Sequence, residues 1–183
     1  MKYVKMRLIP ALAVFGLGLF GVAAPALGIT NYVDGAGTNP VSPFTSWETA
    51  ATNIQDALNV ATNSDTVLVA TGTYALAAQL SLTNAVTLRS AGAASNTTIR
   101  GTSGIRCVYI TASGALVDGL TITAGNIGTG SGGGVYMLNG SVINCTVTSN
   151  AGRYGCGIYM ASGMVSNCVI IANTRWVWAT SGG

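Results

Sequence analysis

A repeat of 23 residues constrains the fold of this chain more than any other sequence feature. Residues 132–137 read GGGVYM, and residues 155–160 read GCGIYM, 23 positions later. The register continues through the whole unit, with the matched pairs Gly140/Gly163, Val142/Val165, Asn144/Asn167, Cys145/Cys168, Val147/Ile170 and Asn150/Asn173. A looser copy lies upstream, since residues 107–110 precede residues 134–137 by 27 positions. Such a period predicts a repeat architecture in which each unit packs against its neighbours.

Short β-like runs follow residue 65, and no periodic segment long enough for a helix lies between them. The runs are 66–70, 86–89, 97–100, 106–110, 120–123, 135–137, 142–148, 158–160 and 165–171. The lack of intervening helices argues against a βαβ fold. A unit of this size with several short strands predicts one coil of a parallel β-helix. The fold class is therefore an all-β solenoid, whose coils stack about 4.8 Å apart.

Stacked coils place repeated residues directly above one another as ladders. We expect Val135/Ile158 and Val147/Ile170 to line the interior. The Asn144/Asn167 and Asn150/Asn173 pairs are expected at turns. Asparagine tolerates left-handed backbone there, and its side-chain amide can hydrogen-bond along the stack.

One amphipathic helix is predicted before the coils, over residues 47–61. Its apolar stripe consists of Trp47, Ala50, Ala51, Ile54, Ala57, Leu58 and Ala61. Thr45 and Glu48 have the spacing of a capping box at its start. We expect this helix to cap the N-terminal end of the stack, where an apolar cross-section and unpaired strand edges need a cover.

The segments 66–74 (TVLVATGTY) and 86–90 (VTLRS), together with the Gly-Gly-Gly-Val-Tyr coil, carry a family resemblance. The chain is similar to right-handed parallel β-helix proteins of the pectin-lyase-like superfamily, of the secreted bacterial type. Its repeats also resemble those of polymorphic outer-membrane proteins. The resemblance extends over nearly all of residues 31–183 and implies a right-handed β-helix. It implies no single activity, because this scaffold carries lyases, hydrolases, adhesins and passenger domains alike.

The N-terminal residues 1–28 have the layout of a secretory signal peptide. Lys2, Lys5 and Arg7 precede an uncharged apolar run over residues 8–27, and small residues at Ala26 and Gly28 fit a cleavage site. An uncleaved membrane anchor is the alternative, since about 20 apolar residues can span a bilayer. We expect an exported protein, extracellular or on the cell surface. Residues 29–65 would hold the first strand and the capping helix, and residues 66–183 the coils.

Signal cleavage changes the charge balance. Three of the eight Lys and Arg residues lie before residue 29, so five Arg remain against five Asp and Glu. A near-neutral chain has no basic patch for phosphates, and we expect no nucleic-acid partner. We also expect no membrane contact after cleavage.

The coil region offers little for catalysis or for binding a cofactor. The chain has no His, and Asp118 is the only carboxylate after Asp65. Lyases of the superfamily that the chain resembles use an acidic calcium cluster with an Arg or Lys base, and its hydrolases use grouped carboxylates. One carboxylate supports neither arrangement, so we predict no catalytic, cofactor-binding or metal-binding residue.

The four cysteines, Cys107, Cys145, Cys156 and Cys168, leave two alternatives open. They are either small apolar ladder residues or include a Cys145–Cys168 disulfide. Equal repeat positions would point both side chains the same way, which strains such a bridge.

Two residue types mark a candidate ligand surface. Tyr109, Tyr136 and Tyr159 share one repeat position and predict an aromatic ladder that either packs internally or faces outward for sugars. Arg89, Arg100 and Arg106 are either separate exposed residues or a small basic group.

The sequence thus favours a non-catalytic exported β-helix scaffold, with surface adhesion or carbohydrate binding as its role. The alternative is the N-terminal part of a polysaccharide lyase or glycoside hydrolase. Gly182-Gly183 stand where a new coil would begin, which predicts a truncated chain; the alternative is that Trp176 and Trp178 cover the last coil. We also expect end-to-end self-association through the last coil.

Overall fold

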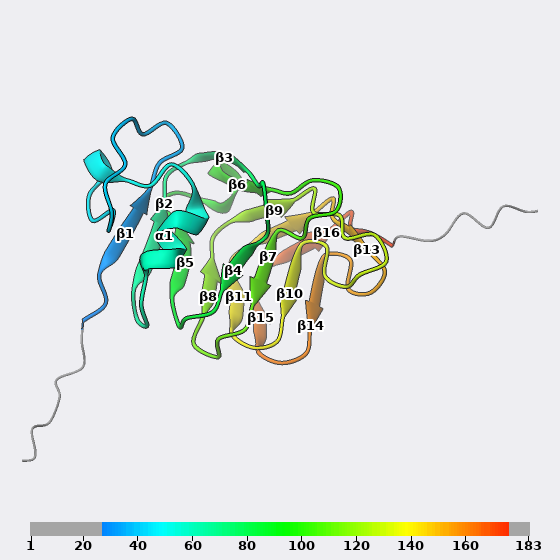
Figure 1. Cartoon of the computed structure of the whole chain (residues 1–183). Coiled ribbons are helices and arrows are strands. Elements are labelled where there is room, and N and C mark those ends of the chain that lie inside the picture. The colour runs from blue at the N-terminus through cyan, green and yellow to red at the C-terminus, as the bar shows by residue number, and fades with distance from the viewer. Residues whose placement is uncertain (1–26, 176–183) are drawn as a thin grey trace, which may run out of the picture.

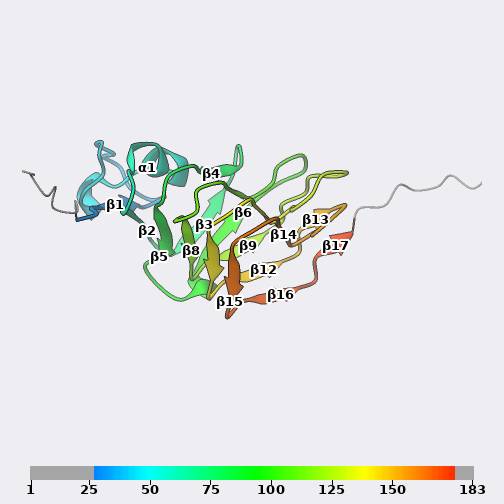
Figure 2. The same cartoon turned by 90° about the horizontal axis from the view of Figure 1, so that it is seen from below.

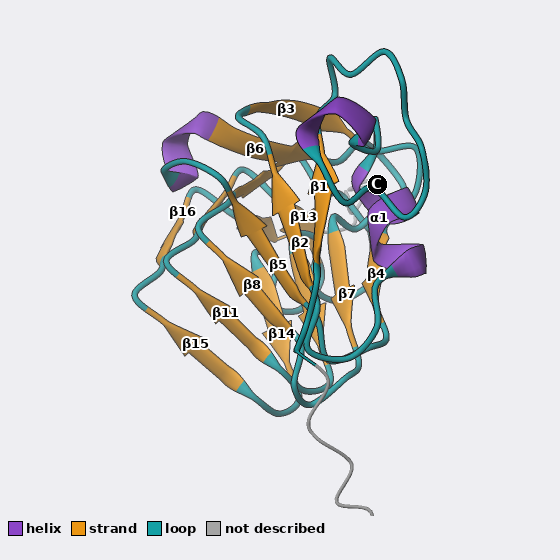
Figure 3. Ribbon diagram, turned by 90° about the vertical axis from the view of Figure 1, so that its left-hand side faces the viewer, coloured by secondary structure: helices purple, strands orange, loops and turns teal. Residues whose placement is uncertain are grey.

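The computed structural model describes residues 27–175 and shows a parallel β-solenoid of about four turns (Figure 1). The chain visits three parallel sheets in each complete coil. Sheet A contains, in spatial order, β1 (Thr30–Val33), β2 (Thr66–Val69), β5 (Thr87–Ser90), β8 (Leu116–Asp118), β11 (Ser141–Ile143) and β15 (Met164–Ser166). Figure 3 shows these six strands side by side, seen from the N-terminal end of the stack.

Sheets B and C complete each coil. Sheet B contains β3 (Gly72–Ala75), β6 (Thr97–Arg100), β9 (Thr121–Thr123), β12 (Thr146–Thr148) and β16 (Val169–Ile171). Sheet C contains β4 (Leu80–Leu82), β7 (Val108–Ile110), β10 (Val135–Met137) and β14 (Ile158–Met160). A short fourth pairing joins β13 (Ala151–Gly152) to β17 (Thr174–Arg175).

The strand register confirms the repeat alignment. Val135 pairs with Ile158 in one neighbouring coil and with Val108 in the other, so the looser upstream copy keeps the same position. Val147 pairs with Ile170, and Val135 and Val147 are fully buried. The expected interior ladders therefore exist, although Ile170 in the last described coil is 47% exposed.

Two predicted strands are each divided by a sharp corner. Residues 142–148 form β11 and β12, and residues 165–171 form β15 and β16. Asn144 and Asn167 lie at these corners with φ values of 53° and 50°. A left-handed residue turns the chain out of one sheet and into the next, which is why an apolar run cannot continue as one strand. The sequence also failed to predict β3, β4 and β8.

Both asparagine ladders are confirmed, in different environments. Asn167 Nδ2 donates to Asn144 Oδ1 at 2.7 Å on the exposed corner. Asn150 is buried, and its Nδ2 donates to Ile122 O and to Asn173 Oδ1, both at 3.0 Å. The second ladder thus supplies partners for backbone groups inside the solenoid, where an unpaired polar group is costly.

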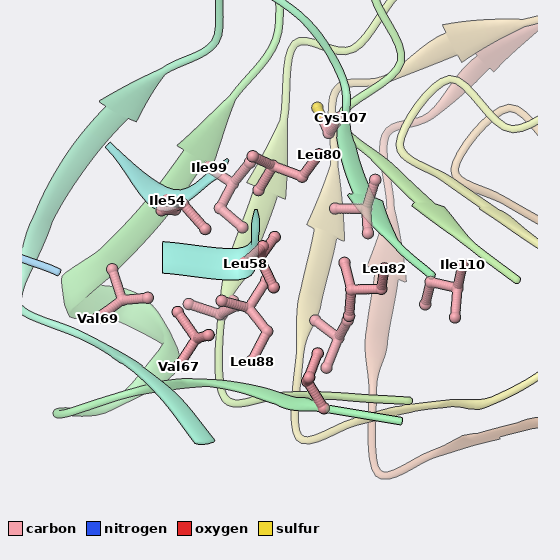
Figure 4. Close-up of a cluster of buried hydrophobic side chains, with 14 of the residues drawn as sticks. Ile54, Leu58, Val67, Val69, Leu80, Leu82, Leu88, Ile99, Cys107 and Ile110 are labelled. Atoms are coloured by element: carbon pink, nitrogen blue, oxygen red, sulfur yellow. The ribbon is translucent and has the colours of Figure 1, made fainter. Parts of the chain in front are cut away.

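The core is one cluster of buried, mainly aliphatic side chains enclosed by the three sheets, and Figure 4 shows part of it. Leu88 of sheet A, Ile99 of sheet B and Leu82 of sheet C are all buried within it. Each strand alternates inward apolar residues with outward ones, as in the burial of β4. Burying one such side chain contributes about 1.5–3 kcal/mol.

The helix predicted over residues 47–61 is shorter in the structure. A 3₁₀ turn, η1 (Trp47–Thr49), is followed by an extended segment and then by α1 (Ile54–Val60). The break has a clear cause, because Ala51 bridges Val33 and exchanges backbone hydrogen bonds with β1. The N-cap residue of η1 is Ser46, which makes no side-chain capping hydrogen bond, so the expected Thr45–Glu48 capping box is wrong. Asn53 instead caps α1 by accepting from the Asp56 N–H at 2.9 Å.

Helix α1 lies against the first coil. Its Ile54, Ala57 and Leu58 are buried, and it contacts β1, β2 and β4. Figure 2 shows α1 and β1 at one end of the stack and β15, β16 and β17 at the other. In the part of the chain that the structure describes, no helix is long and apolar enough to cross a bilayer. The predicted signal peptide, except for its last two residues, and the segment 176–183 lie outside the described residues.

Candidate functional site

Three tyrosines form a ladder on the outer surface of sheet C. Tyr136 pairs in register with Tyr109 on β7 and with Tyr159 on β14, and all three are partly exposed. The Tyr136 and Tyr159 rings are stacked, with centroids 4.8 Å apart and an interplanar angle of 21°. The Tyr109 and Tyr136 rings are tilted by 51° at 5.7 Å. The three rings therefore pack against one another and also lie on the outer surface of the sheet.

Arg106 precedes β7 and lies over this ladder. Its guanidinium carbon is 4.7 Å from the Tyr136 ring centroid and 5.8 Å from that of Tyr109. Its Nε donates to Gly132 O at 2.9 Å, one terminal nitrogen donates to Ser131 O at 2.8 Å, and the other donates to Gln79 Oε1 at 3.0 Å. These bonds and the cation–π contacts hold the side chain in one orientation.

Partial burial lowers the pKa of the Arg106 guanidinium, although the two nearby tyrosines act in the opposite direction. The group keeps its charge at neutral pH, because an arginine pKa starts far above that range. Its three hydrogen bonds use three of the five guanidinium N–H groups. Two donors thus remain without a hydrogen-bond partner among the described residues.

The three candidate arginines do not form one basic group. Arg89 lies on β5 in sheet A, where it pairs in register with Asp118. Arg100 lies on β6 in sheet B, where it pairs with Thr123. Only Arg106 lies beside the tyrosines of sheet C. The three arginines lie on different sides of the solenoid, because each occupies a different segment of its coil and the corners between the sheets separate these segments.

Asp118 serves as a structural acceptor. Its Oδ1 accepts a 2.7 Å hydrogen bond from Asn144 Nδ2, in line with the Asn144–Asn167 ladder. Asp118, Asn144 and Arg89 also line a notch of about 250 Å³ at the corner between sheets A and B. Across residues 27–175, no group of three or more His, Cys, Asp or Glu side chains is placed to hold a metal ion.

All four cysteines are free thiols in the structure, and no Cys145–Cys168 disulfide is formed. Cys107 and Cys145 are buried, and burial raises the pKa of each thiol to about 12. A thiol with so high a pKa is a poor nucleophile at neutral pH. These two residues are therefore buried side chains of the stack and not candidate nucleophiles.

A larger cavity adjoins the tyrosine surface through Gln79. It measures about 410 Å³ and lies between the segment 52–55 and residues 73–80. Gln79 lines this cavity and accepts from Arg106, so it links the two regions. Sequence reasoning missed Gln79 and the cavity, because no motif marks a residue whose role is to orient another side chain.

Comparison with known proteins yields no relative: no family model, no curated protein and no solved structure matches this chain.

Proposed function

We propose that this chain is an exported, non-catalytic β-helix scaffold that binds carbohydrate on the outer surface of sheet C. The observation that carries the proposal is Arg106, held by three hydrogen bonds against the Tyr109–Tyr136–Tyr159 ladder. A prepositioned charged donor beside aromatic edges and hydroxyls suits a polyhydroxylated ligand, because little side-chain entropy is lost on binding. The regular spacing of the ladder suits a chain of similar repeating units.

The finer features of the fold belong to the same proposal. We assign the solenoid a right-handed coil of the pectin-lyase-like type, on the Gly-Gly-Gly-Val-Tyr units and the strand segments that carry the resemblance. We assign α1 the role of an N-terminal cap, on its buried Ile54 and Leu58. We assign residues 1–28 the role of a signal peptide, which would expose sheet C to extracellular or cell-surface glycans.

A glycan array probed with the full chain tests the carbohydrate proposal. Once a bound polysaccharide is identified, Arg106→Ala should weaken its binding at least about tenfold, since a hydrogen bond to a charged group contributes roughly 1.5–3 kcal/mol. Arg100→Ala is the matched control, because Arg100 is an exposed arginine on sheet B, away from the tyrosines. It should leave binding unchanged.

Tyr136→Phe separates ligand contact from structure. It keeps the stacked ring and removes only the phenol hydroxyl, so the ladder should persist while the affinity falls. An array without any bound glycan would overturn the proposal, and so would equal losses from the Arg106 and Arg100 variants.

A further inference from the structure

Three sheet edges meet at the N-terminal end of the stack, and two of them are covered. On β1, the Tyr32 N–H donates to Phe44 O at 2.7 Å, and Tyr32 O accepts from the Ala51 N–H at 2.9 Å. The segment 44–51 thus satisfies this edge through its backbone. Unpaired strand edges otherwise invite pairing with another chain.

The edge of β4 is covered by a side chain. Leu80 N donates to Cys107 O across the β4–β7 pair, so the neighbouring Ser81 N–H points to the opposite side. Gln55 of α1 accepts from this N–H through its Oε1 at 2.9 Å. The short helix thereby protects the edge strand of sheet C.

The edge of β3 is different. Leu76 N donates to Arg100 O, and β3 pairs in register with β6 alone. Because alternate residues of a parallel strand bond to opposite neighbours, Thr73 and Ala75 point their N–H and C=O groups away from β6. Within residues 27–175, these groups have no hydrogen-bond partner, and both residues are exposed.

The cavity of about 410 Å³ lies along this edge. It occupies the place beyond β3 where the coil that begins with β1 would carry a sheet B strand, because sheet A extends one strand further, to β1, while sheet B ends at β3. Ala75, Ala77 and Ala78 form part of its lining, and no charged residue does. The lining also includes the larger apolar residues Ile54, Leu76 and Leu80. The stack therefore contains a vacant strand position with uncharged, partly apolar walls.

We propose that the β3 edge binds an extended peptide segment of a partner protein as an additional strand of sheet B. Thr73 and Ala75 offer donors and acceptors at a two-residue spacing, which is the pattern that an extended polypeptide complements. The uncharged walls select a segment with small or apolar uncharged side chains. This inference does not rest on carbohydrate binding, which uses the outer surface of sheet C.

Hydrogen exchange of the free full chain tests the premise. The Tyr74 and Leu76 amides should be protected through their bonds to β6, while the Thr73 and Ala75 amides should exchange as unprotected groups. Protection of all four amides in the free protein would show that the edge is already occupied and would overturn the proposal.

The probe for the binding step is a synthetic peptide copying residues 120–124 (LTITA), the sheet B strand of another coil with its flanking residues. Its addition should slow exchange at Thr73 and Ala75 at least about tenfold, which corresponds to one added hydrogen bond of about 1.4 kcal/mol. A version N-methylated at two consecutive residues should not bind, because it loses donors on both edges.

Ala75→Pro removes one edge N–H and should weaken peptide binding at least about tenfold. Ala75→Ser keeps that N–H and should bind as the unmodified protein does. The proposal fails if the peptide causes no change at about 1 mM, the concentration that half-fills a site with a Kd of about 1 mM. It also fails if the N-methylated peptide binds equally well. Self-association that Ala75→Pro abolishes would assign the edge to a second copy of the chain and overturn the partner-peptide proposal.

Discussion

Asp65 shows how a single buried carboxylate fixes the entry to the first coil. Its Oδ1 accepts from the Ile29 N–H at 2.8 Å, and its Oδ2 accepts from the Thr62 N–H and hydroxyl at 2.7 and 2.9 Å. Burial raises the pKa of this carboxyl, but the three hydrogen bonds outweigh burial and hold the pKa below its usual value. The ionised form is thus favoured by folding.

The pH dependence of stability follows from that direction. A pKa lowered in the folded state adds stability above the unfolded pKa of about 3.9, and this stability is lost as the pH falls through the folded value. We expect Asp65→Asn to lower the free energy of unfolding by about 1–3 kcal/mol at pH 7. The difference from the unmodified protein should shrink below about pH 4. Urea unfolding at several pH values measures it, and a difference that stays constant down to pH 2 would contradict this account.

At the scale of the element, the buried asparagine ladder joins one coil to the next. Asn150 Oδ1 accepts from the Gly125 N–H at 2.9 Å, and its Nδ2 donates to Ile122 O. The residue therefore pairs backbone groups of the preceding coil with its own side chain, while Asn173 continues the pattern in the following coil. Without the Asn150 side chain, the Gly125 N–H and Ile122 C=O groups would lack these hydrogen bonds.

Asn150→Ala should lower the free energy of unfolding by about 2–4 kcal/mol, because it leaves the buried Gly125 N–H and Ile122 C=O groups without hydrogen-bond partners. The matched control is Asn144→Gly, which removes an exposed ladder amide and keeps the left-handed backbone accessible. We expect the control to change stability by less than about 1 kcal/mol. Chemical unfolding of both variants measures the contrast, which equal losses would refute.

At the scale of the whole molecule, the two ends of the described part of the solenoid, residues 27–175, differ. The first coil is covered by α1 and the segment 44–51, whereas the last described coil presents half-exposed apolar side chains. Met160 is 50% exposed, although its partner Met137 one coil earlier is fully buried. The edges of β14, β15 and β16 have no further strand among residues 27–175. Such a surface favours association.

We therefore predict end-to-end self-association of the chain, measured as a mass that rises with concentration in analytical ultracentrifugation. Ile170→Asp should shift the chain toward the monomer, since it places a charge on the exposed apolar surface of the last described coil. Leu138→Asp is the control, because Leu138 is exposed one coil earlier, after β10. An unmodified protein that stays monomeric at every concentration would refute the prediction.

The sequence by itself determined the parallel solenoid, the coil register and the tyrosine ladder. Stacked coils pair each residue with its repeat equivalent, so a period of 23 residues carries three-dimensional information directly. The same logic placed Asn144 and Asn167 at left-handed corners. The residues of one ladder hold the same position in successive repeats, so the repeat alignment identifies them although they lie far apart in the chain.

Only the tertiary structure decided which surface residues come together. The early coils vary in length, so their corners cannot be located from the repeat, and Arg89, Arg100 and Arg106 fall on three different sheets. Ala51 fits a helical stripe in sequence, but the unpaired edge of β1 recruits its backbone and breaks the helix. Local pattern sets which strands form, and competition for unpaired backbone groups sets how the ends of the stack are closed.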